Sequence, residues 1–242
     1  MAIDETDMGA EKRWRYEHLA EKAVANFKRR RIKAEYVATR GEALEKVMAL
    51  IPDGATVGWG DSVTMEQIGA VEEIRRTMAD RLFDPFAVGP DGTLAAKGEA
   101  RIEVMRKAMA ADVFLSGVNA VTEDGRMVST DATGNRVAPT VFGPKRVIIV
   151  FGANKIVKNL DEALKRIREV VAPINAYRHV LKHNNQRFAD LACARTGACV
   201  DCFHEERICR YTVIIEGERE PATVTGYVPR IHVIIVGEEL GI

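Results

Sequence analysis

The sequence predicts an α/β fold in which a mostly parallel sheet is flanked by helices. Short apolar segments alternate along the chain with segments of helical periodicity, which is typical of a parallel sheet covered on both faces. Residues 146–151 (RVIIVF) are apolar almost throughout, as expected for a strand that is buried on both sides. Because the chain has 242 residues and no low-complexity linker, we expect a single domain over residues 1–242.

Periodicity and turn signals assign the individual elements. Residues 11–31 predict an amphipathic helix with Lys and Arg crowded at its carboxyl end, where the helix dipole favours cations. Further helices are expected over residues 42–51, 64–78, 99–110 and 159–171. Strands are expected over residues 34–38, 55–59, 81–83, 112–115, 127–129, 146–151, 211–215 and 231–236. Residues 10–50 are the N-terminal helical part of this domain, and residues 190–210 interrupt the pattern as an insertion, here called the cysteine segment.

Charge and hydropathy argue against several classes of protein. The 35 Lys and Arg residues balance 35 Asp and Glu residues, whereas a general nucleic-acid binder needs a cationic surplus. No stretch reaches the roughly 20 apolar residues of a membrane-spanning helix. Residues 1–9 are acidic and lack the basic-then-apolar pattern of a signal peptide. We therefore expect a cytoplasmic protein with reduced thiols, no membrane span and no nucleic-acid partner.

All four cysteines of the chain fall in the cysteine segment. Thiolate ligands select zinc, Cu(I) or iron–sulfur clusters. A zinc site with four cysteines usually joins two close CxxC pairs, and only one such pair is present here. Uneven spacing suits a cubane, in which each iron takes one cysteine. We predict an iron–sulfur cluster of the 4Fe-4S type, with zinc as the alternative. The predicted metal ligands are Cys193, Cys199, Cys202 and Cys209.

The neighbours of these cysteines leave other interpretations open. Four ordinary core cysteines would need an apolar segment, and this one is polar. Asp201 and His204 are substitute ligands or, more simply, solvated neighbours. Arg207 and Arg210 are expected to balance the charge of a cluster, and Gly197 to allow a tight backbone path beside it.

Residues 57–64 (VGWGDSVT) join a predicted strand to a predicted helix. Gly58 and Gly60 permit a tight turn and the close approach of a ligand. Backbone amides together with the Ser62 and Thr64 hydroxyl groups would then bind an anion such as phosphate or carboxylate. The same residues equally fit a helix cap, in which Asp61 or Ser62 satisfies the first amides. The spacings of a dinucleotide fingerprint and of a P-loop are absent.

Two more strand ends, at residues 116–120 and 152–155, carry small and polar residues. Ligands of parallel α/β sheets bind beyond the carboxyl ends of the strands, so we expect the three ends to converge on one pocket. Asp131 is the candidate catalytic residue of that pocket. Its other expected ligand-binding groups are Asn119, Asn135, Arg136 and Lys155. The alternative is that Asp131 and Asn135 are turn residues and Arg136 is a surface charge.

Several of these segments together resemble the lactate-utilisation (LUD) domain family, the LutC/YkgG-like proteins. The segments are 114–126 (FLSGVNAVTEDGR), 129–136 (STDATGNR), 150–156 (VFGANKI), 196–202 (TGACVDC) and 231–241 (IHVIIVGEELG), and the resemblance covers about residues 15–242. It implies a fold similar to that of ribose-5-phosphate isomerase, glucosamine-phosphate deaminase and the CoA-transferases. It also implies a part in the oxidation of L-lactate to pyruvate, beside iron–sulfur partner subunits.

The chain departs from the enzymes of that fold at one informative place. Sugar-phosphate isomerases carry an acidic residue after the corresponding strand, in a Gly-Ala-Asp motif, where this chain has Gly117, Val118 and Asn119. A neutral amide cannot serve as a general base. No glutamate matches the CoA-transferase nucleophile either, which argues against both activities.

Two functional hypotheses follow from the residues and the resemblance. In the first, the chain is an iron–sulfur-binding component of L-lactate (2-hydroxy acid) oxidation or related electron transfer. It would bind a small anionic metabolite and work with iron–sulfur or dehydrogenase partner subunits. In the second, it is an isomerase-like, transferase-like or ligand-binding protein with a phosphate- or CoA-like ligand and a structural zinc. A homo-oligomer is compatible with both.

Overall fold

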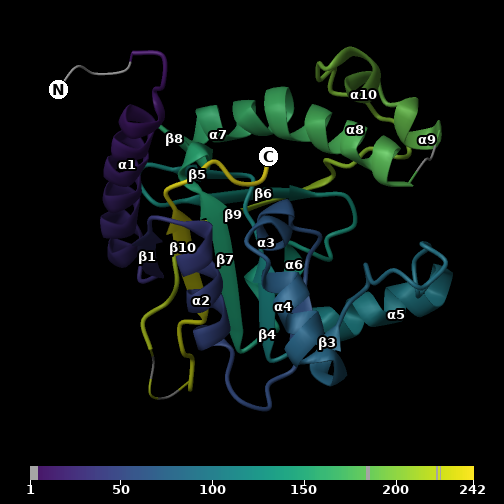
Figure 1. Cartoon of the computed structure of the whole chain (residues 1–242), viewed down its shortest axis with the longest axis horizontal. Coiled ribbons are helices and arrows are strands. Elements are labelled where there is room, and N and C mark those ends of the chain that lie inside the picture. Colours follow the sequence, from purple (N-terminus) through teal and green to yellow (C-terminus); the bar gives the residue numbers. More distant parts are fainter. Residues whose placement is uncertain (1–4, 184–185, 222, 224) are drawn as a thin grey trace.

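The computed structural model describes residues 5–183, 186–221, 223 and 225–242, so the acidic segment 1–9 lies partly outside the described residues. Six strands form a parallel sheet in the order β1-β10-β7-β4-β2-β3 (Figure 1). Their bounds are β1 Lys33–Val37, β2 Val57–Trp59, β3 Leu82–Phe83, β4 Val113–Ser116, β7 Arg146–Gly152 and β10 Ile231–Val236. The expected α/β class, with a mostly parallel sheet flanked by helices, is confirmed.

A second, smaller sheet has the order β8-β5-β6-β9 and mixed strand directions. Its strands are β5 Ala120–Thr122, β6 Met127–Asp131, β8 Ile156–Val157 and β9 Tyr211–Ile215. The sequence predicted β6 and β9 but not β5 or β8. These two short strands begin at or directly after segments 116–120 and 152–155, which were interpreted as the polar ends of the preceding strands.

The helices lie on both sides of the large sheet and above its carboxyl edge (Figure 1). Their bounds are α1 Gly9–Arg29, α2 Arg40–Leu50, α3 Val63–Gln67, α4 Ala70–Thr77, α5 Gly98–Met109, α6 Ala138–Val141, α7 Leu160–Arg166, α8 Ala172–His183, α9 Gln186–Ala189 and α10 Ala192–Thr196. Short 3-10 turns at Ala79–Arg81 and Ala153–Lys155 complete the elements. Among the described residues, no helix is both long and apolar enough to cross a membrane.

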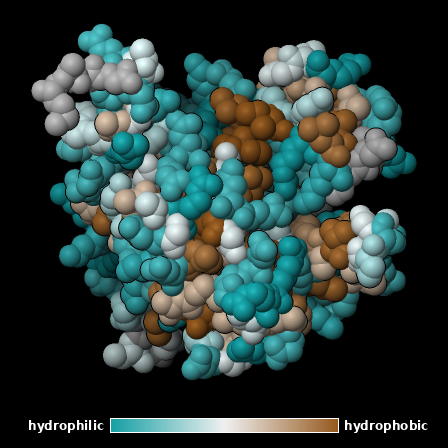
Figure 2. Space-filling model, in the orientation of Figure 1, coloured by the Kyte–Doolittle hydropathy of each residue, from teal (hydrophilic) through white to brown (hydrophobic). Residues whose placement is uncertain are grey.

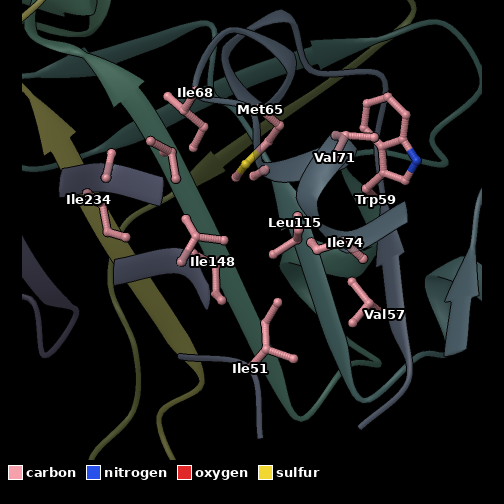
Figure 3. Packing of buried hydrophobic residues seen from close by; sticks show 14 of the residues in the cluster. Ile51, Val57, Trp59, Met65, Ile68, Val71, Ile74, Leu115, Ile148 and Ile234 are labelled. Carbon is pink, nitrogen blue, oxygen red and sulfur yellow. The ribbon is translucent and has the colours of Figure 1, made fainter. Parts of the chain in front are cut away.

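The central strand β7 shows why the sheet is buried on both faces. Alternate side chains of a strand point to opposite faces. Ile148 and Val150 pack into the core beneath α2, α3 and α4, which Figure 3 shows from close by. Val147, Ile149 and Phe151 pack on the other face, against α1 and side chains of the small sheet. A continuous apolar run in the sequence is the consequence.

The small sheet is covered in turn by α7. Residues 160–183, from α7 through α8, form one continuous helical run. Ala163 and Ile167 of this helical run pack against Ala120 and Val128 of the small sheet. The layers are therefore helices α2 to α4, the large sheet, α1 beside the small sheet, and α7. This arrangement carries the helical run from α7 to α8 across the carboxyl edge of the large sheet (Figure 1).

Two of the expected helices differ from the structure. The expected helix 64–78 is two helices, because Gly69 adopts the left-handed region with φ of 77° between α3 and α4. The expected helix 159–171 continues to His183 through a π-helical turn at Ile167–Val171. Pro173 lacks an amide hydrogen and its ring crowds the preceding turn, and the wider π turn just before it lets the helix continue.

Candidate functional site

The residues that follow three adjacent strands, β2, β4 and β7, line one cavity. Thr64 comes from the β2 end, Asn119 from the β4 end and Lys155 from the β7 end. The other lining residues are Asp61, Ser62, Val63, Gly117, Val118, Arg136, Val171, Asn175, Gly241 and Ile242. We call this cavity the inner chamber. Its volume of about 60 Å³ leaves room for a small anionic group and not for a nucleotide.

Lys155 is the most unusual residue of the inner chamber, because a lysine is almost never fully buried unless it is paired. Lys155 is only 4% exposed. Its Nζ atom donates to the carbonyl oxygen of Val118 at 3.1 Å and lies 3.4 Å from the hydroxyl oxygen of Thr64. No carboxylate of the described residues forms an ion pair with it. Burial, and then the positive charges of Arg166 and Arg136, lower the pKa of Lys155 to about 7.

Two arginines, Arg136 and Arg166, both hydrogen-bond to Asn119 at the edge of the inner chamber. Arg166 donates to the carbonyl oxygen of Asn119 at 2.9 Å and to the backbone oxygen of Ile242 at 3.2 Å. Arg136 donates to the side-chain oxygen of Asn119 at 3.3 Å, and its Nε atom lies 4.0 Å from a carboxylate oxygen of Asp131. Burial lowers the pKa of Arg166. Lys155, Arg136 and Arg166 therefore lie close together, while Asp131 is 4.0 Å from Arg136 and the Asp61 carboxylate is paired with Arg178 and Lys182. This local concentration of positive charge favours an anionic ligand.

A second cavity, the outer chamber, adjoins the inner one. Asp61, Arg136 and Asn175 line both, and the outer chamber has a volume of about 230 Å³. Its other lining residues are Phe86, Arg101, Met105, Thr130, Asp131, Ala132, Thr133, Asn135, Arg178, His179, Phe188 and Ile208. A ligand could therefore place a small anionic group inside and a larger part in the outer chamber.

Asp61 fastens helix α8 to the loop after β2. Its carboxylate accepts hydrogen bonds from Arg178, at 2.8 and 3.0 Å, and from Lys182 at 3.1 Å. Burial alone would raise the pKa of Asp61, but the hydrogen bonds and charges of Arg178 and Lys182 outweigh burial and hold it below its usual range. This ion pair keeps the helical run over the two chambers.

The two glycines predicted to bind a ligand line neither chamber. Gly58 lies in β2, where a Cβ atom would collide with the backbone of Ala108 in α5, so its small size allows that helix to pack. A Cβ atom on Gly60 would lie 2.7 Å from the side chain of Arg136. Gly60 therefore makes room for Arg136. Ser62 lines the inner chamber and also caps α3, since its hydroxyl oxygen accepts from the Met65 amide at 3.3 Å.

Asp131 and Asn135 both line the outer chamber and both hold a turn. The two carboxylate oxygens of Asp131 accept from the backbone amides of Ala132, at 2.6 Å, and Arg136, at 2.8 Å. The side-chain oxygen of Asn135 accepts from the Thr133 hydroxyl at 2.5 Å. This bonding matches the turn interpretation. Arg136, by contrast, has a side chain only 15% exposed and is not a surface charge.

The four cysteines are free thiols of intermediate burial, clustered between residue 193 and residue 209. Cys193 lies in α10, and the other three lie in the loop between α10 and β9. The pKa of Cys193 is raised by burial first and then by the nearby Cys202, Cys209 and Cys199, so all four thiols share one neighbourhood.

Arg207 organises this loop. Its Nε atom lies 3.2 Å from the sulfur of Cys209, and its Nη1 atom donates to the carbonyl oxygen of Cys202 at 2.6 Å. Its Nη2 atom donates to Asp201 at 3.0 Å. The amide of Asp201 lies 3.4 Å from the sulfur of Cys199. Hydrogen bonds to cysteine sulfur are one of the ways in which proteins tune iron–sulfur clusters.

The thiols are gathered without converging on a single point. Among the residues that the structure describes, no three His, Cys, Asp or Glu side chains are placed to hold one metal ion. A tetrahedral zinc requires four ligands that each lie about 2.0–2.3 Å from the same atom. A cubane has one iron for each cysteine and is wider, and the four cysteines of this loop region match that ligand count.

The cysteine segment borders the outer chamber. Ile208 lines the outer chamber, and its neighbour Cys209 lines a separate cavity together with Cys199, Asp201 and Arg207. Thr130 lines both cavities. The amide of Arg210 donates to the carbonyl oxygen of Asp131 at 2.9 Å, which ties the loop to the end of β6.

Comparison with known proteins assigns the chain to a family. The model of the LUD domain matches residues 20–236, nearly the whole chain. The chain belongs to the LUD domain family. The crystal structure of a DUF162 family protein from Deinococcus radiodurans aligns over 93% of this chain and 98% of its own, with 12% identity and a TM-score of 0.47. No curated protein matches the sequence significantly.

Three residues of the LUD domain site were not found from the sequence. Arg166 lay within an expected helix, and periodicity does not tell which arginine of a helix turns inward. Asn175 and Arg178 lay beyond the expected helix end at residue 171. Their spacing of three residues places them on one helix face. This spacing could have predicted a shared site if the helix had been extended past Pro173.

Proposed function

We propose that this LUD domain protein is an iron–sulfur-binding component of L-lactate (2-hydroxy acid) oxidation. The cation-lined inner chamber would hold the carboxylate of the small acid, and the cysteine segment would hold the cluster. The observation that carries the proposal is the shared wall at Thr130, which lines both the outer chamber and the cysteine-lined cavity. An acid in the inner chamber would then face the cluster across the outer chamber and the Thr130 side chain.

The charge of the inner chamber supports a small carboxylic acid as the ligand. Arg136 and Lys155 line it, and Arg166 lies behind the backbone oxygens of Asn119 and Ile242. A charge-assisted hydrogen bond from a guanidinium to a carboxylate is about twice as strong as a neutral one. The volume of about 60 Å³ suits an acid of the size of lactate. The chain's own residues thus bind, orient and largely desolvate the acid.

The donor set of the cysteine segment supports the cluster. Cys193, Cys199, Cys202 and Cys209 would ligate it, and when bound it supplies one-electron transfer. Arg207 would hold the Cys209 sulfur and balance negative charge. The alternative with a structural zinc and an acid–base catalyst has less support, because both oxygens of Asp131 accept hydrogen bonds from its own turn.

Partner subunits are part of this proposal, because oxidation of a 2-hydroxy acid releases two electrons and one cluster accepts one.

An exposed apolar stripe supports a docking surface for these partner subunits. Val170, Ile174, Tyr177 and Leu181 recur every three or four residues along the helical run and are 41%, 51%, 52% and 68% exposed. Figure 2 shows hydrophobic surface gathered over this run. Such patches mark interaction sites in soluble proteins.

Metal analysis of anaerobically purified protein tests the proposal. We expect about four irons and four sulfides per chain, with visible absorption that bleaches with dithionite. The variant Cys202→Ser should lose the iron and the colour. Val200→Ala is the matched control, because Val200 lies in the same loop, is exposed and is not a ligand. A colourless protein with one zinc, or full iron content in Cys202→Ser, would overturn the cluster assignment.

A further inference from the structure

The surroundings of Lys155 are those of an amine kept reactive. Enzymes activate a lysine nucleophile by burying it or by placing it next to another cation, and both devices act here. Lys155 is buried, and Arg136 and Arg166 lie close enough to disfavour its protonation. The groups that contact its Nζ atom are a carbonyl oxygen and a hydroxyl oxygen, neither of which carries a charge.

The inner chamber brings this amine and the guanidinium group of Arg136 into one cavity. Lys155 and Arg136 line the same cavity of about 60 Å³. Gly241 closes it on one side, and a Cβ atom there would collide with the Nζ atom of Lys155 and crowd the Thr64 hydroxyl. An acid of three carbons that pairs its carboxylate with Arg136 in this cavity would bring its second carbon toward the Lys155 amine.

We propose that Lys155 forms an imine with the keto carbon of a small 2-oxo acid held in the inner chamber. This inference rests on the proposed function, because a 2-oxo acid is the product of 2-hydroxy acid oxidation. It adds a covalent activity that the oxidation does not require.

The step balances without an oxidant or reductant. The lone pair of the neutral Nζ atom attacks the keto carbon, and the keto oxygen takes a proton and becomes a hydroxyl group. Loss of that hydroxyl group as water, as the C=N bond forms, gives the imine. The Thr64 hydroxyl, 3.4 Å from Nζ, is placed to relay a proton between nitrogen and oxygen. Hydrolysis reverses the sequence and frees the acid.

Reductive trapping tests this directly. The full-length protein is incubated with pyruvate and sodium cyanoborohydride, and the modified lysine is located by peptide mass mapping. We expect one stoichiometric adduct at Lys155. The variants Lys155→Arg and Lys155→Met should lose it, whereas Lys158→Arg should keep it, since Lys158 is exposed and outside the chamber. Mapping in the wild-type protein gives the answer even where a variant fails to fold.

The pH dependence separates an imine from simple anion binding. The charged groups around Lys155 are Arg166 from α7, Arg136 from the loop before α6, and Asp61 from the loop after β2. The pKa of Asp61 is held below its ordinary value, so this carboxylate stays ionised between pH 6 and pH 9. Attack requires the neutral amine, so the trapping rate should rise through about pH 7. Carboxylate binding to protonated Lys155 should weaken over the same range.

The outcomes distinguish this inference from the proposed function. Saturable binding of pyruvate without an adduct at Lys155 would overturn the imine and leave the anion site standing. An adduct at Lys155 in a protein that never binds iron would support the imine and overturn the redox proposal. An adduct spread over many lysines, unchanged in Lys155→Met, would overturn the imine as a non-specific reaction.

Discussion

The inner chamber and the cysteine segment are built in opposite ways. All four cysteines come from seventeen consecutive residues, held by one short helix and by the hydrogen bonds of Arg207. The chamber draws its groups from separate parts of the chain, among them Thr64, Asn119, Lys155 and Asn175, and the large sheet holds most of them. The cysteine segment is therefore easy to recognise in the sequence, but its final geometry depends on the metal that it binds. The inner chamber is hard to recognise in the sequence, but the sheet fixes its geometry before any ligand binds.

Burial follows the same division. Thr64 and Lys155 are 1% and 4% exposed, whereas the cysteines are only partly buried and Phe203 beside them is 95% exposed. Buried side chains in a sheet-supported cavity relax little when they are changed. Substitutions in the chamber should therefore alter binding and stability together. Substitutions in the cysteine segment should alter metal content and leave the core intact.

The largest effect in this comparison is expected for Lys155→Met. The affinity for pyruvate should fall roughly 10- to 100-fold at pH 6, because a charge-assisted hydrogen bond worth about 1.5–3 kcal/mol is lost. Unfolding stability without ligand should increase at and below pH 7, because the variant no longer buries a cation. Isothermal titration calorimetry and urea unfolding measure the two quantities.

The stability difference between Lys155→Met and the wild-type protein should depend on pH. The folded-state pKa of Lys155, about 7, lies below its ordinary value of 10.5. The unfolded chain therefore binds more protons than the folded one between these values, and the stability of the wild-type protein rises with pH across that window. The difference between Lys155→Met and wild type should shrink from pH 7 to pH 10. A difference that is independent of pH would contradict the buried, shifted amine, and Lys158→Met serves as the exposed control.

The parts predicted from sequence are those with a local signal. Residues 146–151 could be read as a doubly buried strand because side-chain alternation disappears only when both faces are covered. The expected convergence of the β2, β4 and β7 ends followed from the rule that parallel strands end at one edge, and the structure brings Thr64, Asn119 and Lys155 together there.

The parts that were missed depend on contacts that no local pattern reveals. Gly69 breaks a helix whose apolar periodicity is continuous on both sides. The π turn before Pro173 keeps a helix going where a proline usually stops one. Gly60 has its role because Arg136, 76 positions later in the chain, packs against it, and only the tertiary structure shows this.

A smaller effect is expected for Asp61→Asn, which tests whether the helical run is fixed over the chambers. The neutral amide leaves Arg178 and Lys182 without their carboxylate. Because these side chains are about one-fifth exposed or more, we expect a loss of about 2 kcal/mol, below the roughly 3–5 kcal/mol of a fully buried pair. Urea unfolding at pH 7 measures it.

Acidification gives this prediction a second test. The folded-state pKa of Asp61 lies below its ordinary value, so the stabilisation is present above pH 4 and is lost as the pH falls further. The gap between wild type and Asp61→Asn should therefore narrow at low pH. Glu66→Gln is the matched control, because Glu66 lies 3.9 Å from Arg178 and is more exposed. Equal losses in the two variants would mean that Asp61 has no special part in holding α8.

The smallest effect is expected for His204→Ala, which tests how local the cysteine site is. His204 lies between Cys202 and Cys209 and is the one histidine of the segment, so by sequence it is a possible ligand. Its Nδ1 atom accepts the Glu206 amide at 3.1 Å, and its carbonyl oxygen accepts from Arg210, so it is occupied in shaping the loop. Iron content should stay unchanged, and stability should fall by about 1 kcal/mol or less. Loss of one iron in four would show that His204 is a metal ligand. The four cysteines would then not be the complete ligand set of the cluster.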